Sequence, residues 1–154
     1  MKRLWLVLVA MSISACASHP PLRSDSFTVA DTLKVPYDKA WRKTLQVLHE
    51  EGFSIDSSSE KGGVISVAES VVRLNERQAD CGNFHGISYL KDYRTSTSIT
   101  LVIDLEKASD EATAIRVNSV LKATFNAGVG SETQYLSCYS RGSLEKHLIS
   151  QIKD

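Results

Sequence analysis

Residues 93–126, YRTSTSITLVIDLEKASDEATAIRVNSVLKATFN, decide the fold. Apolar and polar residues alternate along two segments of this stretch, Tyr93–Glu106 and Thr113–Asn126, which a polar turn at 107–111 separates. One packed face and one wet face are typical of an antiparallel sheet, so this stretch predicts a long antiparallel strand pair. The residues expected on the packed face are Thr97, Ile99, Leu101, Ile103 and Leu105, followed by Ile115, Val117, Leu121 and Phe125.

Two segments outside this pair have apolar residues at helical spacing. The first, 37–51, follows Pro36 and precedes Gly52, which are residues that often begin and end helices. The second, 141–153, lies near the end of the chain. The stripes are Trp41, Leu45 and Leu48 in the first helix and Leu144, Leu148 and Ile152 in the second.

Shorter strands complete the expected order. Strands are predicted at 26–35, 53–56 and 64–69, with a polar connector at 57–63 and a possible short edge strand at 135–138. Residues 75–92 read as a long irregular loop. The order β-α-β-β-β-β-α predicts a two-layer α+β sandwich, an antiparallel sheet with both helices on one face.

The N-terminus has the features of an export signal. Lys2 and Arg3 precede an apolar run at 4–11 that is too short to span a membrane. The following Ile13-Ser14-Ala15-Cys16 resembles the lipobox of bacterial lipoproteins. This resemblance implies a signal peptide at 1–15 and a mature N-terminus at Cys16 that carries acyl chains. The alternative is an ordinary secretory signal in which Cys16 is incidental.

The resemblance also implies a location. No Asp follows Cys16, which in enterobacterial lipoproteins resembles the default sorting to the outer membrane, facing the periplasm. Residues 16–26 are expected to form a tether, stiffened at Pro20-Pro21, whose ten residues after the cysteine reach at most about 35 Å. Residues 27–154 are expected to form one periplasmic domain.

Two cysteines remain in that domain, Cys81 and Cys138. In an oxidising compartment we expect them to form a disulfide, which contributes on the order of 4 kcal/mol for a long loop. A zinc site with His85 and His147 is an alternative, although the spacing is not that of known zinc modules. Free or redox-active thiols are a further alternative, without the Cys-x-x-Cys spacing of redox pairs.

Part of the domain is similar to a known family. Residues 35–41 (VPYDKAW), 52–55 (GFSI) and 62–67 (GGVISV) resemble the domains of BamC, a lipoprotein of the β-barrel assembly machinery. The resemblance covers roughly residues 27–70. It implies a strand, a Trp-bearing helix and a Gly-Val-Ile hairpin. The single domain and the cysteine pair depart from it. Helix-grip domains, which bind lipids, also open with a strand and a Trp-bearing helix.

The sequence contains no recognised catalytic motif, so no catalytic residue, cofactor or metal site is predicted. The chain has 18 basic and 18 acidic residues, which argues against nucleic-acid binding. Phe84, His85 and Tyr89 place aromatic side chains in the 75–92 loop, a modest signal of a partner-binding loop. Packing around the disulfide explains the same residues.

Three functions remain from these observations. The leading hypothesis is a non-enzymatic scaffold or accessory subunit, anchored through Cys16, that binds an envelope protein through the polar sheet face, a sheet edge or the 75–92 loop. The alternative is a carrier for a small apolar ligand or lipid, held in a cavity between helix and sheet. An enzyme with an unfamiliar site is the third.

Overall fold

The structure is a computed structural model that describes residues 26–128 and 130–154. The predicted signal peptide 1–15, the predicted lipidation site Cys16 and the tether before Ser26 lie outside the described residues. The elements are β1 (Ser26–Leu33), α1 (Tyr37–Glu50), β2 (Ile55–Ser59), β3 (Val64–Val71), β4 (Ala79–Asp80), β5 (Asn83–Phe84), β6 (Ile87–Ser88), the 3₁₀ helix η1 (Tyr89–Lys91), β7 (Thr95–Ser109), β8 (Ala112–Asn126), β9 (Thr133–Ser140) and α2 (Ser143–Lys153).

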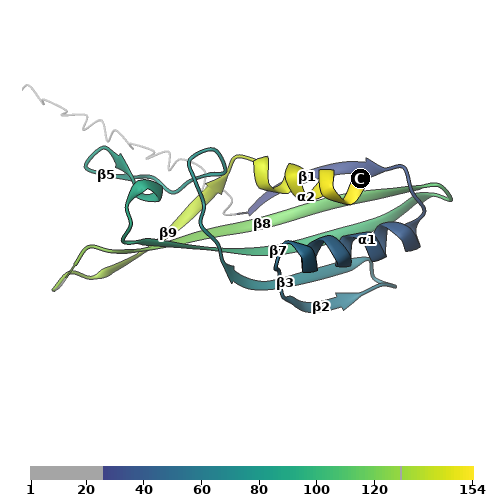
Figure 1. Ribbon diagram of the computed structural model, residues 1–154, viewed down its shortest axis with the longest axis horizontal. Coiled ribbons are helices and arrows are strands. Elements are labelled where there is room, and N and C mark those ends of the chain that lie inside the picture. The colour runs from purple at the N-terminus through teal and green to yellow at the C-terminus, as the bar shows by residue number, and fades with distance from the viewer. Residues whose placement is uncertain (1–25, 129) are drawn as a thin grey trace, which may run out of the picture.

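The prediction of an α+β fold with an antiparallel sheet is confirmed. The main sheet has the order β2-β3-β7-β8, and β7 and β8 form its long central ladder (Figure 1). Two strands share the other edge of β8. β1 pairs with residues 113–120 and β9 with residues 121–126, so that Ser26 and Cys138 face neighbouring residues of β8. β1 and β9 therefore lie end to end along the same edge of β8.

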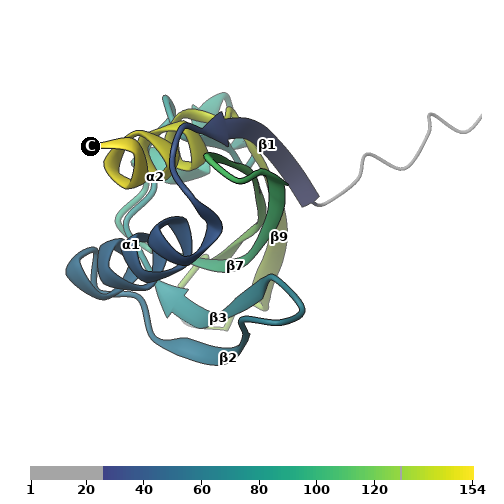
Figure 2. The same ribbon diagram turned by 90° about the vertical axis from the view of Figure 1, so that its right-hand side faces the viewer.

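Both helices lie on the concave side of the curved sheet, as Figure 2 shows. The predicted packed face is confirmed, because the alternate residues of β7 and β8 point towards the helices and are buried. Trp41 and Leu48 of α1 and Leu148, Ile149 and Ile152 of α2 complete the core. The space between helices and sheet is thus filled by side chains.

One polar contact lies inside this core. Glu145, in the first turn of α2, is fully buried, and one of its carboxylate oxygens accepts a hydrogen bond from the hydroxyl of Ser119 on β8. The other oxygen, Oε2, has no hydrogen-bond partner among the described residues. A buried carboxylate is costly unless it is hydrogen-bonded, so this contact fixes where α2 lies along β8.

The expected order of elements needs two corrections along the sheet. The serine run 57–59 was expected in a turn, but it belongs to β2 and pairs with β3. The possible short strand at 135–138 is the eight-residue β9, which pairs with β8 over Leu121–Asn126. β2 is the edge strand of the sheet, and β9 is paired beyond β8 only at its end, by β4. Both strands have largely exposed residues, so neither shows the strong apolar alternation of β7 and β8.

The expectation of an irregular loop at 75–92 is also wrong. This segment contains β4, which pairs with the end of β9, the β5–β6 hairpin and the 3₁₀ helix η1. These pieces are two or three residues long and cover the part of the concave face that the helices leave open (Figure 1). Local turn geometry and the contact with the sheet determine them, and neither produces a periodic pattern.

Gly63, just before β3, lies against the backbone of β7 at Leu105, and its replacement tests the register. Gly63 has φ +70°, and a Cβ there would lie 2.1 Å from the carbonyl oxygen of Leu105. Gly52 has φ +79° and no atom within 4 Å of such a Cβ, so it is the matched control. We expect Gly52→Ala to cost about 1–2 kcal/mol of unfolding free energy. Gly63→Ala should cost about 1–3 kcal/mol more. Urea denaturation measures both, and equal losses would contradict the close contact.

Candidate functional site

The candidate surface is built on a disulfide at one end of the sheet. The sulfur atoms of Cys81 and Cys138 are 2.03 Å apart, and the bond closes a 57-residue separation. Cys81 follows β4, and Cys138 lies in β9 opposite Leu121. The bond joins the loop to the sheet and leaves neither sulfur as a thiolate for the alternative zinc set. In the described part of the chain, no three His, Cys, Asp or Glu side chains are grouped to hold a metal ion.

Beyond the disulfide, the chain forms a tight hairpin. Asn83 pairs with Ser88, and Phe84 with Ile87, which leaves His85 and Gly86 as the two-residue turn. Both turn residues have positive φ, +50° and +82°. Positive φ at both central residues defines a type I′ turn, whose twist matches that of the flanking strands. The turn therefore fixes the direction in which Phe84 and Ile87 project.

An aromatic cluster lies between the hairpin and the sheet. The rings of Phe84 and Tyr89 lie 5.4 and 5.0 Å from that of Phe125 on β8. The hydroxyl of Tyr89 donates to Oε1 of Gln134 on β9 at 3.0 Å. Phe125 is fully buried and Tyr89 nearly so. These contacts hold the hairpin in one position on the sheet.

An ion pair closes the other side of this cluster. Arg94 donates to both carboxylate oxygens of Asp92, at 2.9 and 2.6 Å, and to the carbonyl oxygen of Ala127 at 3.2 Å. Its guanidinium carbon lies 4.8 Å from the centroid of the Phe125 ring. The side-chain hydrogen bonds from Arg94, and then its backbone N–H, lower the pKa of Asp92 to about 2. The ion pair orients Arg94, whose hydrogen bond to Ala127 links the residue before β7 to the residue after β8.

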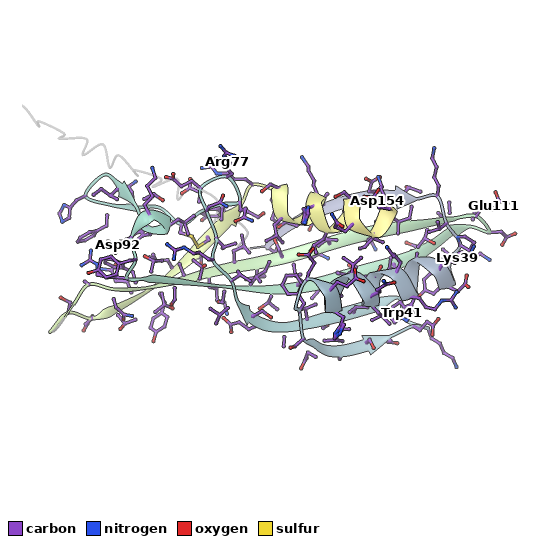
Figure 3. All side chains as sticks on the ribbon, viewed as in Figure 1. Lys39, Trp41, Arg77, Asp92, Glu111 and Asp154 are labelled. Carbon is purple, nitrogen blue, oxygen red and sulfur yellow. A yellow bond between two sulfur atoms is a disulfide. The ribbon has the colours of Figure 1, made fainter. Side chains whose placement is uncertain are left out.

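The same end exposes five large apolar side chains, which we call the aromatic end. At this end, Thr95 of β7 pairs with Phe125 of β8, and Phe125 pairs with Gln134 of β9. Tyr93 lies two residues before Thr95, and Tyr135 follows Gln134. Figure 3 labels Asp92 at this end and Glu111 at the opposite end of the molecule. The five side chains and their exposed fractions are Val71 (85%), Phe84 (37%), Ile87 (61%), Tyr93 (88%) and Tyr135 (83%).

A groove lies beside Val71, one of these five side chains. Its lining combines apolar and polar side chains, which are Val71, Val72, Leu74 and Leu90 on the one hand and Arg73, Asp92, Thr95, Ser96 and Thr97 on the other. The groove has a volume of about 210 Å³ and opens at the surface beside Thr95. This mixed lining fits a partner side chain that has an apolar stem and a polar end.

The predicted loop residues have separate positions in this structure. Phe84 and His85 are exposed on the hairpin, with their rings 4.3 Å apart. Tyr89 is buried and supports the surface from below. The sequence interpretation missed Val71, Tyr93 and Tyr135. A signal was present for Tyr135, since alternation from a buried Cys138 places Tyr135 on the outer face of β9.

Removal of the disulfide tests how much this bond stabilises the aromatic end. We expect the double variant Cys81→Ser/Cys138→Ser to lose on the order of 4 kcal/mol of unfolding free energy. Because the bond joins β9 to the loop, amide exchange should accelerate most in residues 79–91 and 133–140. Exchange in α1, which contains no disulfide partner, is the internal control. Uniform acceleration along the chain would contradict a local role.

The low pKa of Asp92 predicts a dependence on pH. The carboxyl of an unfolded chain titrates near the ordinary value of 3.8, and that of folded Asp92 near 2. The ion pair therefore stabilises the folded state fully above pH 3.8, and this contribution disappears as the pH falls towards 2. Carbon-13 NMR titration of the Asp92 carboxyl measures the pKa. Arg94→Gln should raise the pKa, and an unchanged value would contradict the assignment.

No protein-family model matches the chain, and the search of the curated proteins found no match. Among the similar solved structures are a TBP-like protein from Parabacteroides distasonis (12% identity, TM-score 0.40, covering 78% of this chain and 69% of that one) and a conserved protein from Geobacillus kaustophilus (15%, 0.38, 82% and 89%). A DUF4468 family protein from Bacteroides ovatus is also similar (13%, 0.37, 75% and 63%). Similarity at this level carries no conclusion about function.

Proposed function

We propose that the protein is a non-enzymatic, lipid-anchored scaffold or accessory subunit at the periplasmic face of the outer membrane, and that its aromatic end binds an envelope protein. The observation that carries this proposal is the exposure of Tyr93 and Tyr135, 88% and 83%, on a frame held by a disulfide. Tyrosine supplies a large contact area with little loss of side-chain entropy, and it is enriched at protein interfaces.

The frame supports recognition of a defined surface. The hairpin is held by the disulfide, by Phe84 and Tyr89 on Phe125, and by the Arg94–Asp92 pair. A surface that is already ordered loses less entropy on binding, so the exposed side chains contribute more to affinity. The groove beside Val71, with its mixed apolar and polar lining, offers this surface a place for a side chain of the partner.

The proposed anchor explains how a small surface could be sufficient for binding a partner. Ser26, where the tether ends, pairs with Val120 of β8. Asn126, at the aromatic end, lies six residues further along β8, so the distance along the strand from Val120 to Asn126 is about 20 Å. A tether of about 35 Å places the aromatic end within reach of other proteins of the same membrane. Confinement to that membrane raises the effective concentration of the partner, so a weak contact is enough. The resemblance of residues 27–70 to BamC makes outer-membrane assembly complexes the first partners to test.

The packing favours the scaffold over the carrier. The carrier hypothesis needs an apolar cavity between α1 and the sheet. Trp41, Leu48 and Ile65 are buried between these layers, together with the packed faces of β7 and β8. A groove of about 440 Å³ lies elsewhere, between the start of α2 and the segments 51–53 and 75–78, beside Arg77 and His147.

Site-specific photocrosslinking in intact cells tests the proposal. A photoreactive phenylalanine analogue replaces Tyr93 or Tyr135 in the full chain. We expect one envelope protein to be crosslinked from both positions. The same analogue at Glu111, at the opposite end of the molecule, is the matched control and should give no such product.

The anchor is tested with the same cells. Intact mass of the mature protein should show acyl chains on Cys16, and Cys16→Ser should abolish both this mass and most of the crosslinking at Tyr135. Unmodified Cys16 would refute the lipoprotein. Equal crosslinking from Glu111 and Tyr135 would refute the aromatic end as the binding surface.

A further inference from the structure

A second surface lies along β1, on the half of the molecule away from the aromatic end (Figure 1). β1 pairs with β8 on one side, and within the described residues no strand pairs with its other edge over Phe27–Leu33. Seven of its eight residues are exposed or half-buried, and Leu33 is the exception. An unpaired edge presents backbone N–H and C=O groups to which another strand can add.

One hydrogen bond identifies the backbone groups that face outward. The N–H of Thr32 donates to the carboxylate of Asp31 on the same strand, at 2.7 Å, which places it on the side away from β8. Backbone groups of an antiparallel strand point alternately to its two sides. The N–H and C=O groups of Thr28 and Ala30 therefore face the same open side.

A groove runs between this edge and α2, which lie side by side in Figure 2. Val29 and Ile149 form an apolar floor, and Lys146, Ser150 and Lys153 form the wall on the helix, around a volume of about 160 Å³. A second hollow of about 240 Å³ continues along the chain past Leu33, Lys34 and Val35, and Lys153 lines it as well. A peptide added to β1 would lie along both hollows.

The groove is cationic. Lys34, Lys146 and Lys153 line it, and Asp31 is the one carboxylate among the lining residues. Lys153 Nζ lies 2.5 Å from Asp31 Oδ2. This hydrogen bond, followed by that from Thr32, lowers the pKa of Asp31. Lys34 and Lys146 have no ion pair within the described ranges, so two positive charges remain for a bound partner.

We propose that this groove binds an extended acidic segment of a partner protein, which adds to β1 as a further strand. Main-chain hydrogen bonds to the N–H and C=O groups of Thr28 and Ala30 and to the C=O of Thr32 hold the segment. Its acidic side chains lie against Lys34 and Lys146, and its apolar side chains lie over Val29 and Ile149. The Asp31 carboxylate already binds the N–H of Thr32 and Lys153, which shows the anion chemistry that the groove accepts. The site is separate from the aromatic end and independent of the proposed function.

The test uses the full chain in detergent micelles and a defined probe. The probe is a capped eight-residue peptide in which valine alternates with glutamate, and the control peptide has glutamine in place of glutamate. We expect the glutamate peptide to bind and the glutamine peptide to bind at least about tenfold more weakly. Amide exchange at Thr28 and Ala30, followed by NMR, should slow when the glutamate peptide binds.

Two variants of the protein separate this groove from general charge attraction. Lys34→Glu/Lys146→Glu should weaken binding of the glutamate peptide by at least about tenfold. Lys122→Glu, exposed on β8 away from the groove, is the control and should leave the affinity unchanged. Tyr135→Ala should also leave it unchanged, which separates this proposal from the function of the aromatic end.

Four results would overturn the proposal. These are the absence of binding, an equal loss of affinity in Lys122→Glu, binding without slower exchange at Thr28 and Ala30, and exchange at these amides that is already slow without peptide. In the last case, removal of residues 17–25 or dilution shows whether the chain's own tether or a second copy covers the edge.

Discussion

The fold depends on β8, because this strand pairs along its full length with β7 and along its other edge with both β1 and β9. Its alternate residues, Ile115 to Phe125, bury one face of the sheet, and a shift of register by one residue would expose that whole face. Ser119 on the same strand also holds the buried Glu145 of α2.

The two halves of β8 serve different surfaces. Near Phe125 the strand supports a small aromatic cluster with Tyr89. The Cys81–Cys138 disulfide and the Arg94–Asp92 ion pair further stabilise this end of the sheet. Near Ile115 it supports β1, whose outer edge stays open beside α2. In the two proposals made above, one end of the molecule would bind through side chains and the other through backbone. These modes of recognition differ in chemistry, so the two proposed surfaces would suit different partners.

The parts of the fold that follow a single local pattern could be predicted from the sequence. The alternation from Thr97 to Phe125 located β7 and β8, and Pro36, Trp41 and Gly52 located α1. β2 and β9 were missed or shortened because Ser57–Ser59 and Thr133–Ser137 bury few side chains, and their pairing partners alone make them strands. The lysines of the β1 groove could not be grouped in advance. Lys34 is far from Lys146 in sequence, and only the docking of α2 beside β1 brings them together.

β1 and β9 meet end to end on β8, and this arrangement has a mechanical consequence. Any load that a tethered domain receives through its N-terminus enters at Ser26, the first residue of the β1–β8 ladder. Tension along the strand axis is shared by all the hydrogen bonds of that ladder at once, as in shear. Tension across the axis opens them one after another, beginning at Ser26. The direction of the applied force, and not its magnitude alone, would determine whether β1 stays paired with β8.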